Sequence, residues 1–494
     1  MNKGIKIIFA ILIFSLIFIF FAACGDENKS PENEDPVFDP DNAESQNEES
    51  APQLKSSLPE DLDFGGTVIN IYYFGHEDTV NYDALGEAGG DIVLDAVYQR
   101  NRKTEELLNV KFNWIEGSSD WDTFPGQVKK AMQAASEDYD LIIEENSRAF
   151  QQTLQGYFID LKNADYIDLG QPWWYAKMME EGSIDNNKRY FITGAMNMTT
   201  MFGASAVFFN KDIYKNHFGN TDEIYSHVLG GTWTHDVFAE YCRGVYTDLN
   251  GNQTADAGDL FGFEYEQWGV PNHLSMSTGL TYSSRDKDGL PVLDIYSEQS
   301  ILWGETLYKL LYTDNISFQG DKKVSFLEGK NLFYVGTFGS ANTLRAASFE
   351  YGILPHPKLS EGLDYMSGAA TVNGTAAAVP VFAPSEKLGA VCAALESLCF
   401  EAYKNVVPVW YETALKIKYL DTEIDASIVD IIYDRITAPF IMMADKEMGI
   451  GSIFTNAVYG AKSSGSFTSY YEKNEGSLTK KWDKMIETYL SLEN

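Results

Sequence analysis

The chain has 494 residues, of which 44% are hydrophobic and 14% aromatic, and its formal net charge is −35 at pH 7. A single hydrophobic core stops growing near about 250 to 300 residues, so this length predicts two lobes or domains, and the composition excludes disorder throughout. The negative charge repels nucleic-acid phosphates and anionic lipid head groups, which disfavours nucleic-acid binding.

The N-terminus has the pattern of a secretion signal. Lys3 and Lys6 form a short basic region, and residues 7–23 are apolar except for Ser15. This pattern predicts a signal peptide; a retained membrane-spanning helix is the alternative, because the apolar stretch just reaches spanning length. The small residues before Cys24 resemble a bacterial lipoprotein signal. The resemblance implies that Cys24 carries the lipid, and two acyl chains hold a protein stably to a membrane.

An acidic segment follows over residues 24–58. It consists mainly of Asp, Glu, Asn, Ser, Pro and Gln, with almost no large apolar side chain. Such a segment cannot offset its ordering entropy, so we expect a disordered tether that charge repulsion keeps extended. Signal, lipid and tether together predict a folded body that is lipid-anchored on the extracellular face of the cell membrane.

Three cysteines remain once Cys24 is assigned to lipid. They are Cys242, Cys392 and Cys399, an odd number that cannot all pair within one chain. The sequence therefore implies no disulfide framework. Cys392 and Cys399 lie in an apolar helical run, where a free Cys usually behaves as a small buried hydrophobe.

Strand and helix patterns alternate in the first part of the body. Buried strands are expected at 68–74, 110–114 and 141–143, and helices at 92–108 and 124–135. Strands joined by crossover helices form a parallel sheet covered on both faces, and ligands of such folds bind at the carboxyl ends of the strands. Residues 75–77 and 145–147 are therefore expected at a ligand site.

The same alternation returns further along the chain. Strands are expected at 206–210 and 332–335, and helices at 238–246, 301–311, 388–399 and 478–489, the last with Ser477 as its N-cap. This pattern predicts a second α/β lobe. Since no second linker separates the two parts, the fold class predicted is α/β, with two interleaved, doubly wound lobes.

Motifs of catalysis are missing from the sequence. It contains no nucleophile elbow, phosphate-binding Gly loop, dinucleotide fingerprint, paired CxxC or HExxH helix. His217, His227 and His235 are spaced by ten and eight residues, so no two share a helical turn and a metal cluster is not indicated. Adjacent acids such as 144–145 and 180–181 could in principle supply a glycosidase pair, but catalytic carboxylates normally come from different elements. The absence of these motifs does not exclude an enzyme, and a surface glycosidase is an alternative.

One loop has the ligand spacing of a calcium site. Oxygen-bearing residues fall at positions 1, 3, 5, 7, 9 and 12 of a twelve-residue loop: Asp248, Asn250, Asn252, Thr254, Asp256 and Asp259, with Thr254 offering its carbonyl. The loop departs from an EF-type loop in having Gln253 where Gly is usual and Asp259 where Glu is usual. A structural Ca²⁺ is one interpretation and a hydrated loop of Asx turns is the other; no other cofactor is indicated.

Aromatic residues are abundant, with 29 Tyr, 30 Phe and 9 Trp. Among the tryptophans are Trp173, Trp174, Trp233, Trp268, Trp303 and Trp410. Amphipathic rings line sites for ligands that have apolar faces and polar edges, as sugars do. Core packing is the alternative for each of them, and Trp303, inside a helical apolar pattern, is expected in the core.

Several ordered segments, from about residue 63 to the C-terminus, resemble one known family. They are residues 206–212 (Ala-Val-Phe-Phe-Asn-Lys-Asp), 231–234 (Gly-Thr-Trp-Thr) followed by Phe238, 328–338 with Phe338 in place of a usual Trp, 351–355 (Tyr-Gly-Ile-Leu-Pro), and 374–380 followed by the helix from Glu386. In this order they are similar to the extracellular solute-binding proteins of bacterial carbohydrate ABC importers, the maltose-binding-protein-like family.

The resemblance implies a type II periplasmic-binding-protein-like fold whose two lobes are joined by a hinge, with crossing strands near residues 204, 332 and 369. The implied organisation is a signal peptide at 1–23, a tether at 24–58, lobe 1 at 59–204 and 332–368, and lobe 2 at 205–331 and 369–494. Hinge closure around a ligand is the motion expected of such proteins.

The resemblance also implies a protein that is not an enzyme, in which a monomer captures a sugar or oligosaccharide and delivers it to the permease of an ABC importer. The candidate ligand contacts are Phe74, Glu77, Glu145, Asn146, Thr337, Phe338, Tyr265, Trp268 and Trp410. Rings would stack on sugar faces while carboxylates accept hydroxyl hydrogen bonds. A binder of polyamines or another small solute remains an alternative within the same fold.

Overall fold

A computed structural model describes residues 54–266, 269–280, 282–313, 315–368, 374–411, 422–437, 439–449, 453–460 and 466–492. Leu54–Asn494 forms one compact unit. The predictions for the signal peptide, for Cys24 and for most of the tether lie outside the described residues. In the part of the chain that is described, no helix has both the length and the apolar character needed to cross a bilayer.

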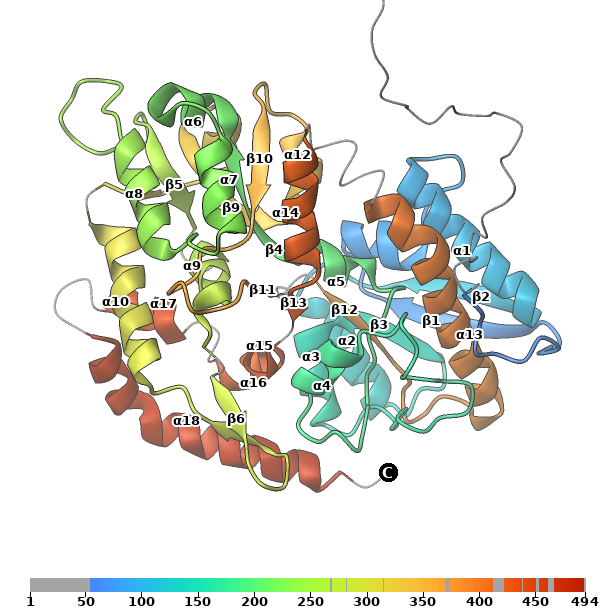
Figure 1. The fold of residues 1–494 in the computed structure, drawn as a ribbon. Coiled ribbons are helices and arrows are strands. Elements are labelled where there is room, and N and C mark those ends of the chain that lie inside the picture. Colours follow the sequence, from blue (N-terminus) through green and yellow to red (C-terminus); the bar gives the residue numbers. More distant parts are fainter. Residues whose placement is uncertain are drawn as a thin grey trace, which may run out of the picture. The chain divides into compact units, whose positions relative to one another are not determined.

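The first sheet has the strand order β12-β3-β1-β2 (Figure 1). Its strands are β1 (Thr67–Tyr73), β2 (Val110–Glu116), β3 (Leu141–Glu145) and β12 (Thr375–Ala378). β1 pairs in parallel with β2 and β3, and β12 joins β3 in the antiparallel sense. The crossover helices are α1 (Ile92–Leu108) and α2 (Thr123–Gln133), which confirms the predicted alternation of strand and helix.

Local sequence signals explain the ends of α1. The Asp91 side chain accepts a hydrogen bond from the Val93 N–H at the N-cap. At the other end, Asn109 adopts the left-handed conformation with a φ of 49°, which is typical of a helix C-terminus. Between these ends Val93, Val97 and Leu108 are buried, so the helix covers the sheet with an apolar stripe.

The second sheet has the order β10-β4-β9-β5-β8. Its strands are β4 (Ser205–Asn210), β5 (Phe261–Tyr265), β8 (Ser317–Gln319), β9 (Asn331–Thr337) and β10 (Tyr351–Leu354). β5 runs parallel to β8 and β9, and β4 runs antiparallel to β9 and β10. The helices that contact these strands include α6 (Lys211–Phe218), α8 (His235–Val245), α9 (Gly269–Leu274), α10 (Glu298–Tyr312), α11 (Lys322–Leu327) and α14 (Glu423–Tyr433).

The strand pairing differs from the expected lobe boundaries in two places. The sequence places residues 332–368 in lobe 1, but β9 and β10 belong to the second sheet with β4 and β5. It places residues 369–494 in lobe 2, but β12 belongs to the first sheet. An apolar strand pattern does not encode which distant strand supplies its backbone hydrogen bonds, and this choice is made only by tertiary packing.

The remaining elements connect or cover the sheets. They are η1 (Thr79–Ala84), α3 (Asn146–Thr153), α4 (Ala176–Glu181), α5 (Met198–Phe202), α7 (Asp222–Leu229), η2 (Met276–Thr278), β6 (Ser283–Arg285), β7 (Pro291–Leu293), α12 (Ser340–Leu344), β11 (Ser367–Gly368), η3 (Ser385–Lys387), α13 (Leu388–Glu401), η4 (Ala402–Val406), β13 (Ile436–Thr437), α15 (Phe440–Met443), α16 (Asp445–Met448), α17 (Ile453–Gly460) and α18 (Phe467–Leu490). β6 and β7 form a hairpin, and β11 and β13 form a short parallel pair.

The last helix is longer than the sequence pattern predicts. α18 begins at Phe467 behind Ser466, whose hydroxyl accepts the Ser469 N–H, so Ser477 lies inside the helix and is not its cap. α18 contacts α10, α17 and α16 (Figure 1). Near its C-terminus, the Tyr489 ring packs edge-on against Tyr190 at 5.6 Å between centroids. The helix therefore connects elements around the second sheet with the segment that leads to α5.

Several sequence-based expectations for the core are confirmed. Cys242, Cys392 and Cys399 are buried free thiols. Trp303 is fully buried. Trp173 and Trp174 are buried as well, and both indole N–H groups donate to the Glu396 carboxylate at 2.9 Å. Trp233 donates to the Pro355 carbonyl at 2.9 Å, so these tryptophans are structural anchors and not open stacking surfaces.

Candidate functional site

The carboxyl ends of the first sheet carry a group of aromatic side chains. β1, β2 and β3 are parallel and end at one edge, and the Phe74 ring, which follows β1, lies 4.6 Å from the Trp121 ring and 5.8 Å from the His76 ring. The His76 and Trp121 rings are 5.3 Å apart. Phe74 is buried whereas His76 and Trp121 are partly exposed, so the group offers an aromatic surface at the edge where ligands of α/β folds bind.

A small cavity adjoins these rings. It is lined by Phe74, His76, Asp78, Thr79, Trp121, Glu145, Gly374 and Thr375. Its enclosed space is about 10 Å³, which is close to the space that one water molecule occupies. A sugar would therefore contact this edge from its open side, or after the partly exposed rings have moved.

Glu145 is the buried acid of this edge. It ends β3 and caps α3, accepting hydrogen bonds from the Ser147 N–H at 2.9 Å and the Ser147 hydroxyl at 2.8 Å. Burial raises the pKa of Glu145 to about 7, against the opposing effect of these hydrogen bonds. Burial and the neighbouring Glu145 also raise the pKa of Glu144, which accepts a hydrogen bond from Gln152. A carboxyl group that titrates near neutrality can accept or donate hydrogen bonds to a polar ligand.

A second buried acid, Asp83, connects two of the segments by which the chain passes between the sheets. Its carboxylate accepts the Thr199 N–H at 2.9 Å, the Thr199 hydroxyl at 2.5 Å and the Thr375 hydroxyl at 2.6 Å. Thr199 lies on α5, which leads into β4, and Thr375 begins β12. Burial raises the pKa of Asp83 to about 6, so the folded protein bears a desolvation cost at this junction.

The matching edge of the second sheet is polar and buried. β5, β8, β9 and β10 all end at this edge, and Ser205, the first residue of β4, pairs there with Thr337. The Ser205 hydroxyl lies 2.6 Å from His273 Nδ1, and the His273 ring stacks on His356 at 6.3 Å. Burial lowers the pKa of His273 to about 3 and that of His356 well below its usual value. Both rings are therefore neutral and can exchange hydrogen bonds as donor or acceptor.

An aromatic chain runs from this edge to η1. The Trp410 ring lies 6.1 Å from Phe338 and 5.2 Å from Phe202, and the Phe202 ring lies 4.4 Å from Tyr82. The structure thus brings two predicted ligand contacts, Phe338 and Trp410, into one cluster. Trp410 is only 6% exposed, so in this conformation the cluster is packing between elements of the two sheets.

A larger cleft lies between α4 and the β6–β7 hairpin. It is lined by Lys177, Glu180, Glu181, Asn186, Gly279, Leu280, Ser283, Arg285, Gly289, Met366, Thr437, Pro439 and Phe440. Its volume of about 520 Å³ falls within the range of about 300 to 1,000 Å³ that is usual for small-molecule sites. Arg285 donates to the carbonyls of Ser183 and Ile184 at 2.6 and 2.8 Å, which joins the hairpin to the end of α4.

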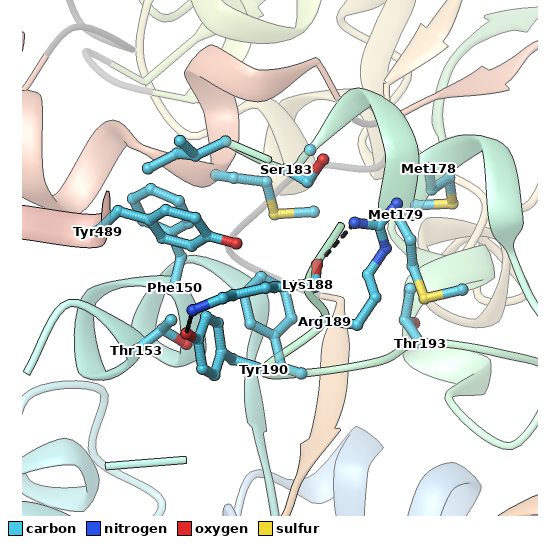
Figure 2. Close-up of a pocket in the computed structure, with 14 residues that line it drawn as sticks. Phe150, Thr153, Met178, Met179, Ser183, Lys188, Arg189, Tyr190, Thr193 and Tyr489 are labelled. Carbon is cyan, nitrogen blue, oxygen red and sulfur yellow. Dashed lines mark hydrogen bonds between the residues drawn. The ribbon is translucent and has the colours of Figure 1, made fainter. Parts of the chain in front are cut away.

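A third hollow, shown in Figure 2, is a packing gap. Its space is about 30 Å³, and methionine and aromatic side chains such as Met178, Met179 and Phe150 surround it. The nearby polar groups pair with one another, since Lys188 Nζ lies 3.1 Å from the Tyr190 hydroxyl and Arg189 donates to the Lys188 carbonyl at 2.7 Å. The gap is too small for a sugar and lies away from the carboxyl edges, so we do not assign it a ligand.

The predicted ligand contacts are distributed as follows. Phe74 and Glu145 line the small cavity, Asn146 is buried beside it, and Thr337, Phe338 and Tyr265 lie at the carboxyl edge of the second sheet, with Trp410 against Phe338. Glu77 is exposed and does not line the cavity, where its neighbour Asp78 does. Trp268 lies outside the described residues.

Sequence reasoning missed three residues of the site. Trp121 lies beyond the end of β2 at Glu116, so a rule that selects residues directly at strand ends, as it selected Phe74 and Glu145, does not reach it. His273 and His356 had no sequence signal, because the first lies on a helix and the second follows β10 in an apolar stretch. Their proximity arises only from the pairing of β4 with β9 and β10.

In the described ranges, and with the side chains placed as they are in this conformation, no three His, Cys, Asp or Glu side chains already converge on a metal position. The calcium-type loop at 248–259 combines carboxylates with Asn side chains and a carbonyl, and its geometry is considered below.

Comparisons with known proteins give a fold and no sequence family. No family model and no curated protein matches the sequence. Among solved structures, the chain is similar to the protein UgpB of Mycobacterium tuberculosis in complex with glycerophosphocholine, at 14% identity and a TM-score of 0.55, covering 85% of this chain and 100% of that one.

Two further solved structures agree. An ABC transporter solute-binding protein of Thermotoga lettingae bound with α-D-tagatose has 13% identity and a TM-score of 0.54, covering 84% and 100% of the two chains. The maltose/maltodextrin-binding domain of Bdellovibrio bacteriovorus bound to maltotriose has 12% identity and a TM-score of 0.52, covering 85% and 100%. The chain thus has the type II periplasmic-binding-protein fold, as the sequence predicts.

Proposed function

We propose that this protein is the solute-binding component of an ABC importer, and that it captures a sugar, oligosaccharide or polyol between two lobes built on the two sheets. The observation that carries the proposal is the placement of functional groups at both carboxyl edges, with the connecting segments joined at Asp83. Contacts made by both lobes exist only in the closed form, so the ligand would shift the population toward the form that a permease recognises.

The sugar class is supported by the chemistry of the first edge. The rings of Phe74, His76 and Trp121 offer faces for the C–H surface of a sugar, and Glu145 offers hydroxyl hydrogen bonds. Of the three similar solved structures named above, two hold α-D-tagatose and maltotriose, and the third holds glycerophosphocholine. On this reading no bond of the ligand is broken.

Two features speak against glycosidase chemistry. Glu144 and Glu145 are neighbours on β3, so their side chains point to opposite faces of the strand. Glu144 pairs with Gln152, whereas Glu145 pairs with Ser147. A glycosidase needs two carboxyl groups that face one bond from opposite sides.

A cationic solute such as a polyamine is the second candidate. The small cavity has two carboxyl groups, Asp78 and Glu145, and three aromatic rings, and no Lys or Arg lines it. Aromatic faces attract cations, as carboxylates do. Cation binding would weaken as salt concentration rises, whereas binding of a neutral sugar would not.

The test is calorimetric titration of the purified protein with neutral sugars and polyols, uronates and polyamines, followed by chromatography of the ligand. Saturable one-to-one binding of a sugar that is recovered unchanged would support the proposal. Salt-sensitive polyamine binding would favour the second candidate, and cleavage products would identify an enzyme. A ligand at a hundred times its Kd should also stabilise the folded state by about 2.7 kcal/mol.

The location at the extracellular face of the membrane is a further part of the proposal. It rests on the signal-like N-terminus, on Cys24 and on the acidic segment after it. Replacing Cys24 with Ala should release the protein from the membrane fraction into the medium, with no loss of ligand affinity. Retention of Cys24→Ala in the membrane fraction would contradict a lipid anchor at this residue.

A further inference from the structure

A closed loop connects α8 to β5. Its two ends are joined by a pair of backbone hydrogen bonds, from the Thr247 N–H to the Leu260 carbonyl at 3.1 Å and from the Leu260 N–H to the Thr247 carbonyl at 3.0 Å. The twelve residues 248–259 between these ends carry the oxygen spacing of an EF-type loop. The loop is attached at the amino end of β5, opposite the edge that carries Tyr265.

Side-chain oxygens of the loop accept hydrogen bonds from the loop's own backbone N–H groups. Asp248 accepts the Gly251 N–H at 2.6 Å and the Gln253 N–H at 2.7 Å. Asn252 accepts the Thr254 N–H at 2.7 Å, and Asp256 accepts the Gly258 N–H at 2.7 Å. These bonds hold the side chains at positions 1, 5 and 9 over the inside of the loop.

The side chains at positions 3, 5 and 9 meet. Asn250 Nδ2 lies 3.0 Å from Asp256 Oδ1, and Asn252 Nδ2 lies 2.6 Å from Asp256 Oδ2. A Cβ atom at Gly258 would lie 2.8 Å from Asn250 Nδ2 and 2.9 Å from Asp256 Oδ1, so a larger residue would collide with this group. Gln253, at the position where an EF-type loop has Gly, nevertheless keeps the left-handed conformation with a φ of 62°.

An independent observation at position 12 points to a ligand. Asp259 is fully buried, and its Oδ2 accepts the Asp256 N–H at 3.2 Å and the Tyr246 hydroxyl at 3.4 Å, so the carboxylate lies against the backbone of loop position 9. Its other oxygen, Oδ1, has no hydrogen-bond partner among the described residues. A buried carboxylate oxygen without a partner is costly, and a bound cation removes that cost.

We infer that this loop binds one Ca²⁺ ion, held by side-chain oxygens of five residues and the carbonyl of Thr254. The side-chain ligands are those of Asp248, Asn250, Asn252, Asp256 and Asp259. Oxygen ligands in a flexible loop suit Ca²⁺, whereas Mg²⁺ requires a tighter octahedron and gives up its water reluctantly. On binding, the bonds between the Asn amide groups and Asp256 give way to bonds between oxygens and the ion.

The role of the ion is structural. It would close the connection between α8 and β5 at the end of the second sheet that is distant from the ligand edge. We therefore expect Ca²⁺ to raise the melting temperature of the protein and to leave its affinity for a solute unchanged. The inference does not depend on the proposed function, since the loop contributes no residue to the ligand edges.

The experiment uses the full chain after treatment with a chelator. Ca²⁺ is titrated by calorimetry, melting temperatures are compared in Ca²⁺, Mg²⁺ and EDTA, and Tb³⁺ emission is excited through tyrosine, because Tyr246 adjoins Asp259. We expect stoichiometric Ca²⁺ binding, a melting temperature several degrees higher, and a Tb³⁺ signal that Ca²⁺ displaces. Asp259→Asn should weaken binding at least tenfold, and so should Asn252→Ala, an exposed position that keeps the fold intact if the first variant unfolds.

The matched control is Asp286→Asn in the β6–β7 turn, where Asp286 accepts the N–H groups of Asp288 and Leu290 at 2.8 and 3.0 Å in a comparable exposed turn. This variant should respond to Ca²⁺ as the parent does. No heat and no change in melting temperature on adding Ca²⁺ would overturn the inference. The inference would also be overturned if Asp259→Asn and Asn252→Ala both bound Ca²⁺ as tightly as the parent does. If Mg²⁺ raised the melting temperature as much as Ca²⁺ does, the choice of ion would be wrong.

Discussion

Glu145, which we propose as a ligand contact, is buried at a cost to stability. It is buried at the end of β3 and accepts hydrogen bonds from the Ser147 N–H and hydroxyl. These bonds do not offset the desolvation of the carboxylate, since burial still raises the pKa of Glu145 to about 7. Residues retained in spite of such a cost are candidates for binding or catalysis. The same reasoning does not apply to Glu77, which is exposed and bears no such cost.

Replacing Glu145 with Gln should therefore stabilise the unliganded protein at pH 8 and weaken ligand binding. Because the pKa of Glu145 rises from 4.5 to about 7 on folding, its favourable contribution is complete below pH 4.5 and is lost as the pH rises through 7. Relative to the parent, the variant should gain on the order of 3 kcal/mol in the free energy of unfolding between pH 4.5 and pH 8, measured by urea unfolding. Glu137→Gln, at an exposed position, is the control, and an equal pH profile for both variants would contradict this account.

Trp121 is the residue whose ring we expect to stack on the ligand. Trp121→Ala should weaken binding by about 1 to 2 kcal/mol, and Trp121→Phe should restore most of the loss, since a ring face is what the contact needs. Trp173→Phe, in the core, should reduce thermal stability and leave the affinity unchanged. Calorimetry of the three variants with the identified ligand distinguishes a stacking role from a packing role. Unchanged affinity in Trp121→Ala would remove this residue from the site.

At the scale of elements, the segments that lead from α5 into β4 and from β10 into β12 both meet η1. Asp83 lies in this turn and accepts hydrogen bonds from α5 and from β12, while Arg100 of α1 donates to the Asp83 and Ala84 carbonyls at 2.7 and 3.2 Å. The aromatic chain from Tyr82 through Phe202 to Trp410 packs beside it. Through these hydrogen bonds, η1 sets the positions at which the crossing segments leave the first sheet.

Removing the Asp83 carboxylate should loosen both crossing segments at once. Asp83→Ala leaves the Thr199 N–H and two hydroxyls without their acceptor, and a buried unpaired donor costs about 1 to 3 kcal/mol. We expect a loss of about 3 kcal/mol in the free energy of unfolding, together with faster amide exchange in α5 and β12. Asp138→Ala, at an exposed position, should change neither quantity. Exchange that stays slow in α5 and β12 of the Asp83 variant would contradict the role of this junction.

The whole molecule contains buried acids and buried imidazoles whose pKa values shift in opposite ways. Burial raises the pKa of Asp83 to about 6 and that of Glu145 to about 7, so their contributions to stability fall as the pH rises from about 4 to 7. Burial lowers the pKa of His235 and His273 from 6.5 to about 3, so their contributions are complete above pH 6.5 and are lost as the pH falls toward 3.

These opposed effects predict a stability maximum at about pH 5 to 6, where the folded and unfolded chains bind similar numbers of protons. Urea unfolding measured from pH 4 to pH 8 in the absence of ligand tests this directly. We expect stability to decrease on both sides of the maximum. A free energy of unfolding that increases steadily up to pH 8 would show that the buried acids are stabilised by groups other than those described here.

The sequence by itself determined the class of the fold and much of the first edge. Apolar periodicity is a local property, so the strands and helices around 67–145 were predictable, and the carboxyl-end rule then selected Phe74 and Glu145. The regular oxygen spacing of residues 248–259 was also readable, because all of its ligands lie in one short loop. The start of α18 at Phe467 was missed because polar residues and Gly476 interrupt its apolar pattern.

Only the tertiary structure decided which strands pair and which distant residues meet. The sheet membership of β9, β10 and β12 depends on backbone hydrogen bonds to distant strands, and those bonds leave no trace in side-chain periodicity. Two contacts follow from that pairing: the stacking of His273 on His356, and the hydrogen bonds that the Thr199 and Thr375 hydroxyls donate to Asp83. Burial is likewise a property of the folded chain, so the desolvation that distinguishes Glu145 from Glu77 could not be read from residue type.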